Sequence, residues 1–436
     1  MTGQGEKKTD HAKAVFGATI WMLVFAILIG FSASSPYMRA VADFYAEQIP
    51  FFKKDWRSVT GLKPTEHLED LRPDLEKPIK PDLDRMQPGV TLLSGLIDGK
   101  LGLRLVDENG AVIHDWPLDF FDIDVDGKIY HYQALIHGTY LYPNGDALVN
   151  LDQKGIYRID ACGRIKWISE ARTHHSIDVD ENGAIWAPEI AHGYLEQRLY
   201  RHAYNLDLIV KIDPETGKTL DRIDLTKAFL DSENEGLAVW ENPDYSDLLH
   251  VNDVEVLSGA DAPAFPMFSA GDILVSSRLR NALFVIDGKT KLIKWSRVGP
   301  MQFQHDPDFE RDGTISIFDN RGAELATAEN NWLGDRGGSR ILSIRPGEYA
   351  FKTLYSSTKA HPFYSPRRGK HQRLANGDIL IAETDSGRAF EITPGGDIVW
   401  QYVNKFNDRE VGWITGALRY PASYADFPKS CPATSE

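Results

Sequence analysis

The feature that most constrains the fold of this chain is an internal repeat. One copy spans residues 141–167 and another spans residues 374–400. Both begin with a turn and a strand, continue through a turn of small residues into a strand that ends in Ile-Asp or Ile-Thr, and close after a Gly turn with a strand that ends in Trp. Self-similarity at this length indicates a repeat architecture, in which each unit packs on its neighbours.

Four further copies bring the number of units to six. They span residues 90–116, 270–295, 181–189 with 207–223, and 311–320 with 338–355. A unit of three or four antiparallel strands cannot bury both faces of its own sheet. Six units packed face to face around an axis solve this problem, so we predict an all-β, six-bladed β-propeller. A seven- or eight-bladed propeller with a degenerate unit remains an alternative, and the repeats disfavour a β-sandwich.

The N-terminal region has a different composition. Residues 14–38 contain no charged side chain and are apolar enough and long enough to span a bilayer as a helix. Three lysines in residues 1–13 precede this stretch, which favours a short cytoplasmic tail and an exported remainder. We therefore predict an uncleaved transmembrane anchor. A cleavable signal peptide, with small residues at 32–34 near the cleavage site, is the competing interpretation.

The predicted anchor sets the expected domain order and location. Residues 39–88 are predicted to form a short stalk, with a juxtamembrane helix followed by a Pro-rich linker, and residues 89–436 form the propeller. The protein is expected in the inner (cytoplasmic) membrane as a single-pass protein, with the propeller on the periplasmic side. Cys162 and Cys431 match no metal or redox spacing. They could pair in an oxidising compartment, but the sequence leaves this open.

The net charge limits the class of partner. At a formal charge of −15, the chain is not expected to bind nucleic acid, because a polyanion is attracted to basic surfaces. A small anion would still bind if the chain built a local cationic pocket.

Histidines recur just upstream of the Gly turns of the repeat. His137, His175 and His305 each precede a turn glycine by eight residues, His371 precedes one by six, and His250 opens the strand of another unit. Equivalent positions on successive blades form a ring about the propeller axis. If that position opens the innermost strand, the histidines converge at one end of the channel. The alternative is that each histidine only holds a strand end by hydrogen bonds.

Two further segments carry groups suited to anions. His250 and Asn252 lie two residues apart, so their side chains would share one face of a strand and offer two hydrogen-bond donors. Arg278 and Arg280 lie where a strand is expected to turn over. The planar guanidinium of an arginine there could bind a three-oxygen anion, although a solvated surface position is the commoner outcome.

The motifs HHSIDVDENG, HVNDVEV, DILVSSR and QHDPDFERDGTISIFDN follow in this order, and the resemblance they carry extends over about 89–420. In these motifs the chain resembles the bacterial arylsulfotransferases that use no nucleotide (PAPS) sulfate donor. The resemblance implies a six-bladed propeller without a cofactor, which moves a sulfuryl group from a phenolic sulfate ester to a phenol by a ping-pong mechanism through a sulfo-histidine. It implies that His305 is the nucleophile, assisted by His250, His175 and Arg278. The substrate-binding set that we predict is Asn252, His174, His371 and His137.

The sequence leaves two other functions open. A metal-dependent propeller hydrolase could place zinc or copper on histidines, or calcium on oxygens such as those of Asp178, Asp306 and Asn252. No HExxH motif or cysteine cluster is present, so we predict no metal site. A non-catalytic scaffold is the third possibility. The expected partners are an aryl sulfate donor, a phenolic acceptor and the membrane, with a homo-oligomer also possible.

Overall fold

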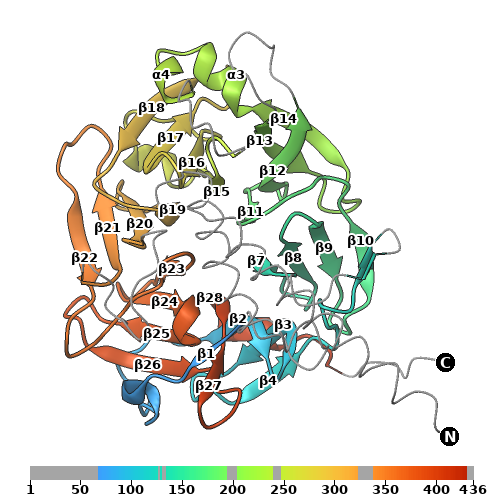
Figure 1. Cartoon of the computed structure of the whole chain (residues 1–436), viewed down its shortest axis with the longest axis vertical. Coiled ribbons are helices and arrows are strands. Elements are labelled where there is room, and N and C mark those ends of the chain that lie inside the picture. Colours follow the sequence, from blue (N-terminus) through green and yellow to red (C-terminus); the bar gives the residue numbers. More distant parts are fainter. Residues whose placement is uncertain are drawn as a thin grey trace, which may run out of the picture. The chain divides into compact units, whose positions relative to one another are not determined.

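The computed structural model describes residues 67–125, 128–129, 134–193, 204–238, 247–322 and 337–429. Within these residues the chain forms six four-stranded antiparallel sheets around a central axis (Figure 1). The predicted all-β, six-bladed propeller is therefore confirmed. Each sheet is one blade, and one of its edge strands lies nearest the axis.

Each blade consists of four strands in order from the axis outward. The first blade contains β28 (Ile414–Tyr420), β2 (Val90–Ile97), β3 (Lys100–Val106) and β4 (Val112–Asp115). The second contains β7 (Ile136–Leu141), β8 (Ala147–Leu151), β9 (Gly155–Ile159) and β10 (Ile165–Ile168). The third contains β11 (Asp178–Val179), β12 (Ile185–Gly193), β13 (Tyr204–Ile212) and β14 (Thr219–Asp224).

The remaining three blades follow in chain order. The fourth contains β15 (Val251–Val256), β16 (Ile273–Ser277), β17 (Ala282–Ile286) and β18 (Ile293–Val298). The fifth contains β19 (His305–Phe309), β20 (Ile315–Asp319), β21 (Arg340–Ile344) and β22 (Lys352–Ser356). The sixth contains β23 (Lys370–Arg373), β24 (Ile379–Glu383), β25 (Arg388–Ile392) and β26 (Ile398–Val403).

Burial follows the position of a strand within its blade. Middle strands such as β8 and β16 are buried at every residue, whereas the outer strand β10 is largely exposed. A middle strand is covered on both faces by the neighbouring blades, so both sets of its alternating side chains are buried. The hydrophobic core accordingly joins adjacent blades, as where Leu93 of the first blade packs with Trp400 of the sixth.

The last strand of the chain closes the ring. β28 pairs antiparallel with β2, in a register that runs from Val90 opposite Tyr420 to Gly95 opposite Ile414. The repeat copy at 90–116 therefore supplies only three strands of its blade, and the far end of the chain supplies the innermost one. The blade is held together by backbone hydrogen bonds between the two ends of the propeller.

The segment before the first blade lies against the propeller from His67 onward. β1 (Leu68–Asp70) pairs antiparallel with β27 (Glu410–Gly412). The buried Arg72 reaches the sixth blade, where its guanidinium lies 2.7 Å from the Glu383 carboxylate. Most side chains of the Pro-rich stretch at 77–85 are exposed. The predicted transmembrane and juxtamembrane helices fall outside the described residues.

Helices are short in the part of the chain that the structure describes. The two α-helices are α3 (Leu225–Leu230) and α4 (Glu235–Ala238), and the 3₁₀ turns are η2 (Pro73–Leu75), η3 (Ala262–Ala264), η4 (Thr384–Ser386) and η5 (Ala422–Ala425). None of the described helices has the length and apolar character needed to cross a bilayer. A small hairpin of β5 (Asp124–Val125) and β6 (Lys128–Ile129) completes the described elements.

Cys162 is disulfide-bonded, and Cys431 falls outside the described residues.

Candidate active site

Four of the predicted histidines meet near the axis, at the point where the inner strands begin. The ring centroids of His137 and His175 lie 4.2 Å apart, those of His175 and His250 5.2 Å, and those of His175 and His305 6.2 Å. His174 joins the same cluster, with its ring centroid 5.0 Å from that of His175. The expectation that side chains from four different blades converge is met for these residues.

Local backbone irregularity directs these side chains toward the axis. His175 and His250 adopt left-handed φ angles of 56° and 48°, a conformation that L-residues enter only at a cost of about 1–2 kcal/mol. The pairing register shifts at the start of β7, β15 and β19, beside His137, His250 and His305 respectively. A bulge re-aims a side chain relative to the regular pleat, and such strain persists only where the surroundings hold it.

The histidines line two connected cavities. A cavity of about 260 Å³, called the histidine chamber, has His137, His174, His175 and His250 in its walls. A narrower space of about 20 Å³, called the constriction, contains His305 and shares His137 and His175 with the chamber. His305 therefore faces the narrow extension of the chamber.

The ring of His305 is held in one orientation and one tautomer. Its Nδ1 lies 2.7 Å from Asn320 Oδ1 and 3.0 Å from the Phe303 carbonyl. Asn320 Nδ2 donates to the carbonyls of Ser365 and Arg368, both at 2.7 Å, which leaves its Oδ1 as an acceptor. Nδ1 of His305 must therefore carry the proton, and Nε2 keeps its lone pair.

Burial keeps the histidine rings neutral. It lowers the pKa of His305 to about 3, an effect strengthened by the positive charge of Arg278. Burial also lowers the pKa of His174 to about 4 and the pKa of His175 well below its ordinary value. A neutral imidazole is the form that can act as a nucleophile.

His250 has a carboxylate partner within short hydrogen-bond distance. Its Nδ1 lies 2.6 Å from Asp247 Oδ2, and its backbone N–H donates to Asp247 Oδ1 at 3.0 Å. Burial opposes ionisation of Asp247, but the hydrogen bonds and the charge of His250 together outweigh it and lower the pKa of the carboxyl group. A histidine held by a carboxylate can carry a proton and return it.

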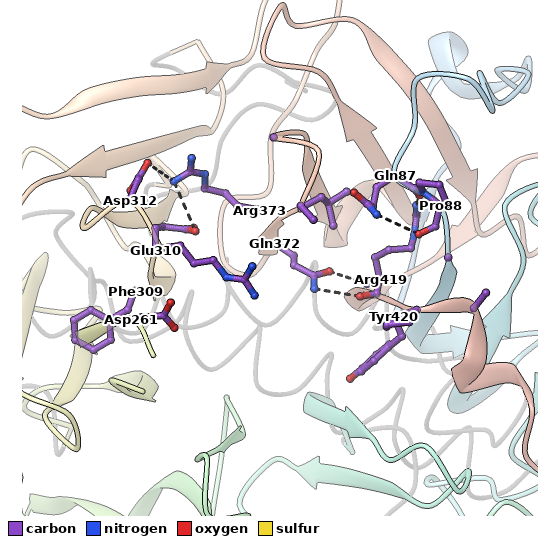
Figure 2. Close-up of a pocket in the computed structure, with 17 residues that line it drawn as sticks. Gln87, Pro88, Asp261, Phe309, Glu310, Asp312, Gln372, Arg373, Arg419 and Tyr420 are labelled. Atoms are coloured by element: carbon purple, nitrogen blue, oxygen red, sulfur yellow. Dashed lines mark hydrogen bonds and ion pairs between the residues drawn. The ribbon is translucent and has the colours of Figure 1, made fainter. Parts of the chain in front are cut away.

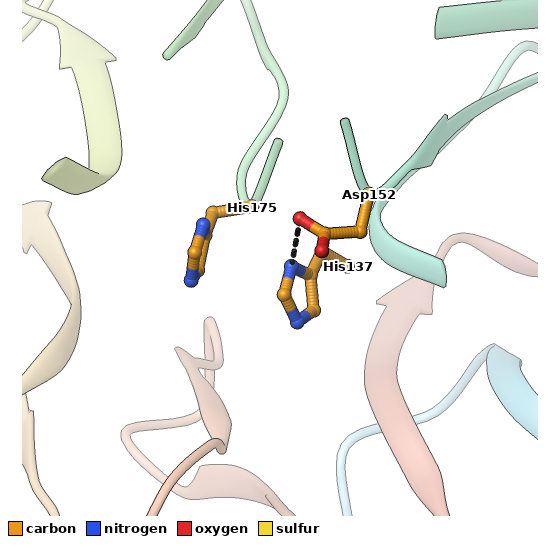
Figure 3. A group of neighbouring side chains, drawn as sticks. All are labelled: His137, Asp152 and His175. Atoms are coloured by element: carbon orange, nitrogen blue, oxygen red, sulfur yellow. Dashed lines mark ion pairs between the residues drawn. The ribbon is translucent and has the colours of Figure 1, made fainter. Parts of the chain in front are cut away.

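His137 lies beside Asp152, and the ring of His175 is their neighbour (Figure 3). The nearest atoms of His137 and Asp152, Nδ1 and Oδ1, are 3.4 Å apart. Burial disfavours the Asp152 carboxylate, yet the adjacent His137 lowers its pKa to about 2. Nitrogen and oxygen atoms of these three residues lie within 4.8 Å of one another, which is close enough for two imidazoles and a carboxylate to share a transition-metal ion.

Asn252 and His250 line different cavities. His250 lines the chamber and Asn252 lines the constriction with His305. The predicted shared face fails because His250 precedes β15 in a left-handed conformation and the register shifts next to Asn252. Asn252 Nδ2 donates to the Gln304 carbonyl at 2.7 Å, and its buried Oδ1 has no hydrogen-bond partner among the described residues.

Arginines supply positive charge at the chamber. Arg278, a residue predicted from the sequence, lines it and lies 4.4 Å from the centre of the Phe303 ring. Arg367 and Arg368 also line it, and the sequence-based prediction missed both. The sequence did contain a signal for these two arginines. They belong to the run Arg-Arg-Gly-Lys directly before His371, and the position eight residues before the turn glycine Gly377 is Gly369, next to Arg368.

His371 is the predicted site residue that the structure brings to neither the chamber nor the constriction. It is buried on β23, where Nε2 lies 2.8 Å from Ser316 Oγ and Nδ1 lies 3.2 Å from Asp306 Oδ2. β23 pairs with β24 without a register shift, so nothing turns this ring toward the other histidines. His371 precedes its turn glycine by six residues rather than eight, so the sequence already distinguished it from His137, His175 and His305.

His371 lines an acidic cavity of about 300 Å³, which shares Ser176, Asp306 and Lys370 with the constriction. Lys370 Nζ lies 2.6 Å from Asp306 Oδ1, so Asp306 already has a cationic partner. Burial raises the pKa of Asp253 and of Asp308 well above the ordinary value for a carboxyl group. Oxygen and nitrogen atoms of Asp306, Asp308 and His371 lie within 4.8 Å of one another, and Lys370 supplies the positive charge at that point.

In a further cavity, of about 840 Å³, several polar side chains pair with one another (Figure 2). Arg373 lies 3.0 Å from Asp312 and 3.7 Å from Glu310. Gln372 exchanges hydrogen bonds with the Arg419 backbone. We therefore place the candidate active site in the histidine chamber and the constriction, where imidazoles with a free lone pair lie beside arginines.

Comparison with known proteins assigns the chain to a family. Residues 141–405, more than half of the chain, match the family model described as "Arylsulfotransferase (ASST)". No curated protein matches the chain.

Similarity to solved structures is weak. A protein of unknown function from Bacteroides caccae is 13% identical, with 76% of this chain and 98% of that chain covered and a TM-score of 0.48. Virginiamycin B lyase from Staphylococcus aureus is 14% identical, with 62% of this chain and 69% of that chain covered and a TM-score of 0.36. Neither similarity carries an argument about function. On the family match, the chain belongs to the arylsulfotransferase family.

Proposed function

We propose that this protein transfers a sulfuryl group from an aryl sulfate ester to a phenolic acceptor, through a covalent intermediate on His305. The observation that carries the proposal is the hydrogen bonding of His305. Asn320 fixes the proton on Nδ1 and leaves the lone pair of Nε2 beside the chamber. Family membership supports the same chemistry.

In the first half of the reaction, Nε2 of His305 attacks the sulfur atom of the donor. An N–S bond forms as the S–O bond to the aromatic ring breaks. The phenolate oxygen takes a proton from His250, whose Nδ1 is held by Asp247. The imidazole of His305 keeps its Nδ1 proton, and the Asn320 oxygen stabilises the positive charge that develops on this ring.

In the second half, an acceptor phenol occupies the place of the departed product. Its hydroxyl proton passes to His250 as its oxygen attacks sulfur and the N–S bond breaks. The proton lost by His250 in the first half is thereby regained, and His305 returns to its starting form. A His–Asp pair is suited to this task, because the histidine gives one proton and then takes one back at the same position.

Charge stabilisation is the largest contribution that the chamber can offer. A sulfuryl group in transfer spreads negative charge over three oxygens, much as a transferring phosphoryl group does, so catalysis relies on positioning and on nearby cations. Arg278 lines the chamber in a chain whose net charge is −15. This is the local cationic pocket that an acidic protein needs for an anionic substrate.

Intact-mass measurement after incubation with 4-nitrophenyl sulfate tests the proposal. We expect one added sulfuryl group, which disappears when a phenol is supplied. His305→Asn should show no adduct, and His361→Asn, which changes an exposed histidine, should behave as the wild type does. An adduct on the His305→Asn protein would contradict the proposal. Activity that is lost on chelation and restored by zinc would favour metal-dependent hydrolysis instead.

We also propose that the chain is anchored in the inner membrane by residues 14–38, with the propeller on the periplasmic side. The apolar stretch and the preceding lysines support this location. The disulfide at Cys162 is consistent with an oxidising compartment. Recovery of the full-length chain in the soluble fraction after cell lysis would contradict the anchor, and a shortened N-terminus by mass would indicate a signal peptide.

A further inference from the structure

Arg368 differs from the other arginines in the propeller interior. Arg72 and Arg388 both pair with Glu383 at 2.7 Å. The side chain of Arg368 makes no hydrogen bond or ion pair with any of the described residues. Its guanidinium lies 4.5 Å from the centre of the Trp413 ring, and this stacking contact leaves the in-plane N–H groups available.

The position of Arg368 relates it directly to the candidate active site. It is half-buried and lines both the histidine chamber and the constriction that contains His305. Its backbone carbonyl accepts the hydrogen bond from Asn320 Nδ2, the same amide that orients His305. The residue is therefore anchored by its main chain, while its charged end is unpaired among the described residues.

Three carboxylates line the chamber with the arginines. Asp247 is engaged by His250 and Asp152 by His137. Asp207 accepts a hydrogen bond from the backbone N–H of Val251. The charges of Asp385 and Asp152 act on Arg368, but neither carboxylate forms an ion pair with it. In the proposed reaction the transferring sulfuryl group lies with Arg278 and His305. The positive charge of Arg367 and Arg368 then favours a second negative charge on the ligand.

The chamber volume limits how large that ligand can be. At about 260 Å³, the chamber lies at or below the lower end of the range for drug-sized ligands, roughly 300–1,000 Å³. A phenol with one aromatic ring and small substituents fits such a space.

We propose that Arg368 binds a carboxylate on the aromatic substrate, so that the preferred substrates are phenols bearing a ring carboxylate, together with their sulfate esters. The inference rests on the proposed function, in which the phenolic oxygen of the same ligand exchanges the sulfuryl group with His305. Planar, two-point recognition of a carboxylate is the contact for which a guanidinium is best suited.

The test compares 4-hydroxybenzoate with 4-hydroxybenzamide as acceptors, with 4-nitrophenyl sulfate as the donor. We expect Arg368→Gln to lower the benzoate-to-benzamide ratio of kcat/KM by about 10- to 100-fold, the range for losing a hydrogen bond to a charged group. Activity with the benzamide should change little. Comparing the ratio between variants cancels the difference in intrinsic reactivity of the two phenols.

Two variants control the comparison. Arg368→Lys keeps the charge without the planar fork and should give an intermediate ratio. Arg164→Gln removes one positive charge from an exposed turn residue and should keep the wild-type ratio. An Arg368→Gln protein that loses both activities equally, or that keeps the wild-type ratio, would overturn the proposal.

Calorimetric binding of the same two phenols separates this inference from the proposed function, because binding needs no turnover. If no sulfuryl transfer occurs with either acceptor, the proposed function fails. A loss of benzoate binding of about 10-fold or more in Arg368→Gln, with benzamide binding retained, would still establish the carboxylate site. Equal binding of both phenols to the wild-type protein would refute it.

Discussion

His305 is oriented by an amide, and His250 is oriented by a carboxylate. The Asn320 oxygen holds the Nδ1 proton of His305 without placing a negative charge beside the ring, so burial still lowers its pKa to about 3. His305 is therefore a neutral imidazole across the physiological pH range, as a nucleophile must be. His250, beside Asp247, is the ring suited to exchange protons. Similar side chains have different tasks because their immediate partners differ.

The amide of Asn320 offers a direct test of this difference. We expect Asn320→Ala to lower kcat by about 100-fold through loss of orientation at His305, with a smaller effect on KM. Asn404→Ala is the matched control, because Asn404 is also buried and also donates to two carbonyls, those of Leu96 and Gly412. Single-turnover formation of the sulfuryl adduct measures the effect. A kcat that falls equally in both variants would mean that Asn320 acts only through stability.

His67 tests the role of buried neutral histidines in stability. It packs against Phe121 and Trp413, neither ring nitrogen has a well-formed hydrogen bond among the described residues, and burial lowers its pKa to about 3. Between pH 6.5 and 3 the unfolded state binds a proton that the folded state does not, so stability falls as pH falls.

We expect His67→Leu to remove this contribution. The slope of unfolding free energy against pH should decrease by up to about 1.4 kcal/mol per pH unit between about pH 6 and 4. The stability near neutral pH should stay the same or rise, because an apolar side chain replaces a polar one that lacks a well-formed hydrogen bond. Urea titrations at each pH give the slope, and parallel slopes for the two proteins would contradict the assignment.

At the scale of elements, three of the inner strands that carry a site histidine begin irregularly. β7, β15 and β19 each begin with a register shift, and each brings a histidine to the chamber or constriction. β23 pairs in continuous register, and its histidine lies in the acidic cavity instead. The irregular strand start is thus part of what builds the site.

Gly369 tests the equivalent position in the sixth blade. Its φ is +134°, and a Cβ there would lie 2.3 Å from the Phe318 ring, so Gly369→Ala should cost about 2–4 kcal/mol of stability and displace the adjoining Arg368. Gly183→Ala also changes a glycine of positive φ, but in open space, and should cost about 1 kcal/mol. Chemical denaturation measures both, and equal costs would show that crowding at Gly369 is not the cause.

For the whole molecule, closure of the ring depends on strands from opposite ends of the propeller. β28 and β2 form one blade, so the channel and its histidines exist only when the last strand is in place. β1 pairs with β27 outside the blades and adds the Arg72–Glu383 ion pair. These two terminal contacts should contribute very differently to folding.

Two truncated chains distinguish the contribution of the β28–β2 pairing from that of β1 and Arg72. A chain that ends after Gly412 lacks β28 and should show no cooperative unfolding transition, because the first blade loses its inner strand and the ring opens. A chain that begins at Glu76 lacks β1 and Arg72 and should fold cooperatively with a lower midpoint. Circular dichroism during heating reports both outcomes. Cooperative unfolding of the chain without β28 would contradict the role given to ring closure.

Much of the fold and part of the site were predictable from sequence. The repeat units matched the blades because each strand and turn is encoded locally, by alternating apolar residues and turn glycines. The same periodicity placed His137, His175 and His305 at equivalent positions. His371 was wrongly grouped with them, because a shared position in the repeat says nothing about whether a strand begins with a bulge.

Sequence by itself determined the repeat units and predicted six blades with histidines at equivalent positions, since these depend on patterns within a few dozen residues. Only the tertiary structure decided that β28 completes the first blade, that Asn320 orients His305, and that Arg368 lies in the chamber without a partner among the described residues. These features depend on which distant segments the closed ring brings together. The physical reason is that local patterning sets secondary structure, while packing around a common axis sets the neighbours of each side chain.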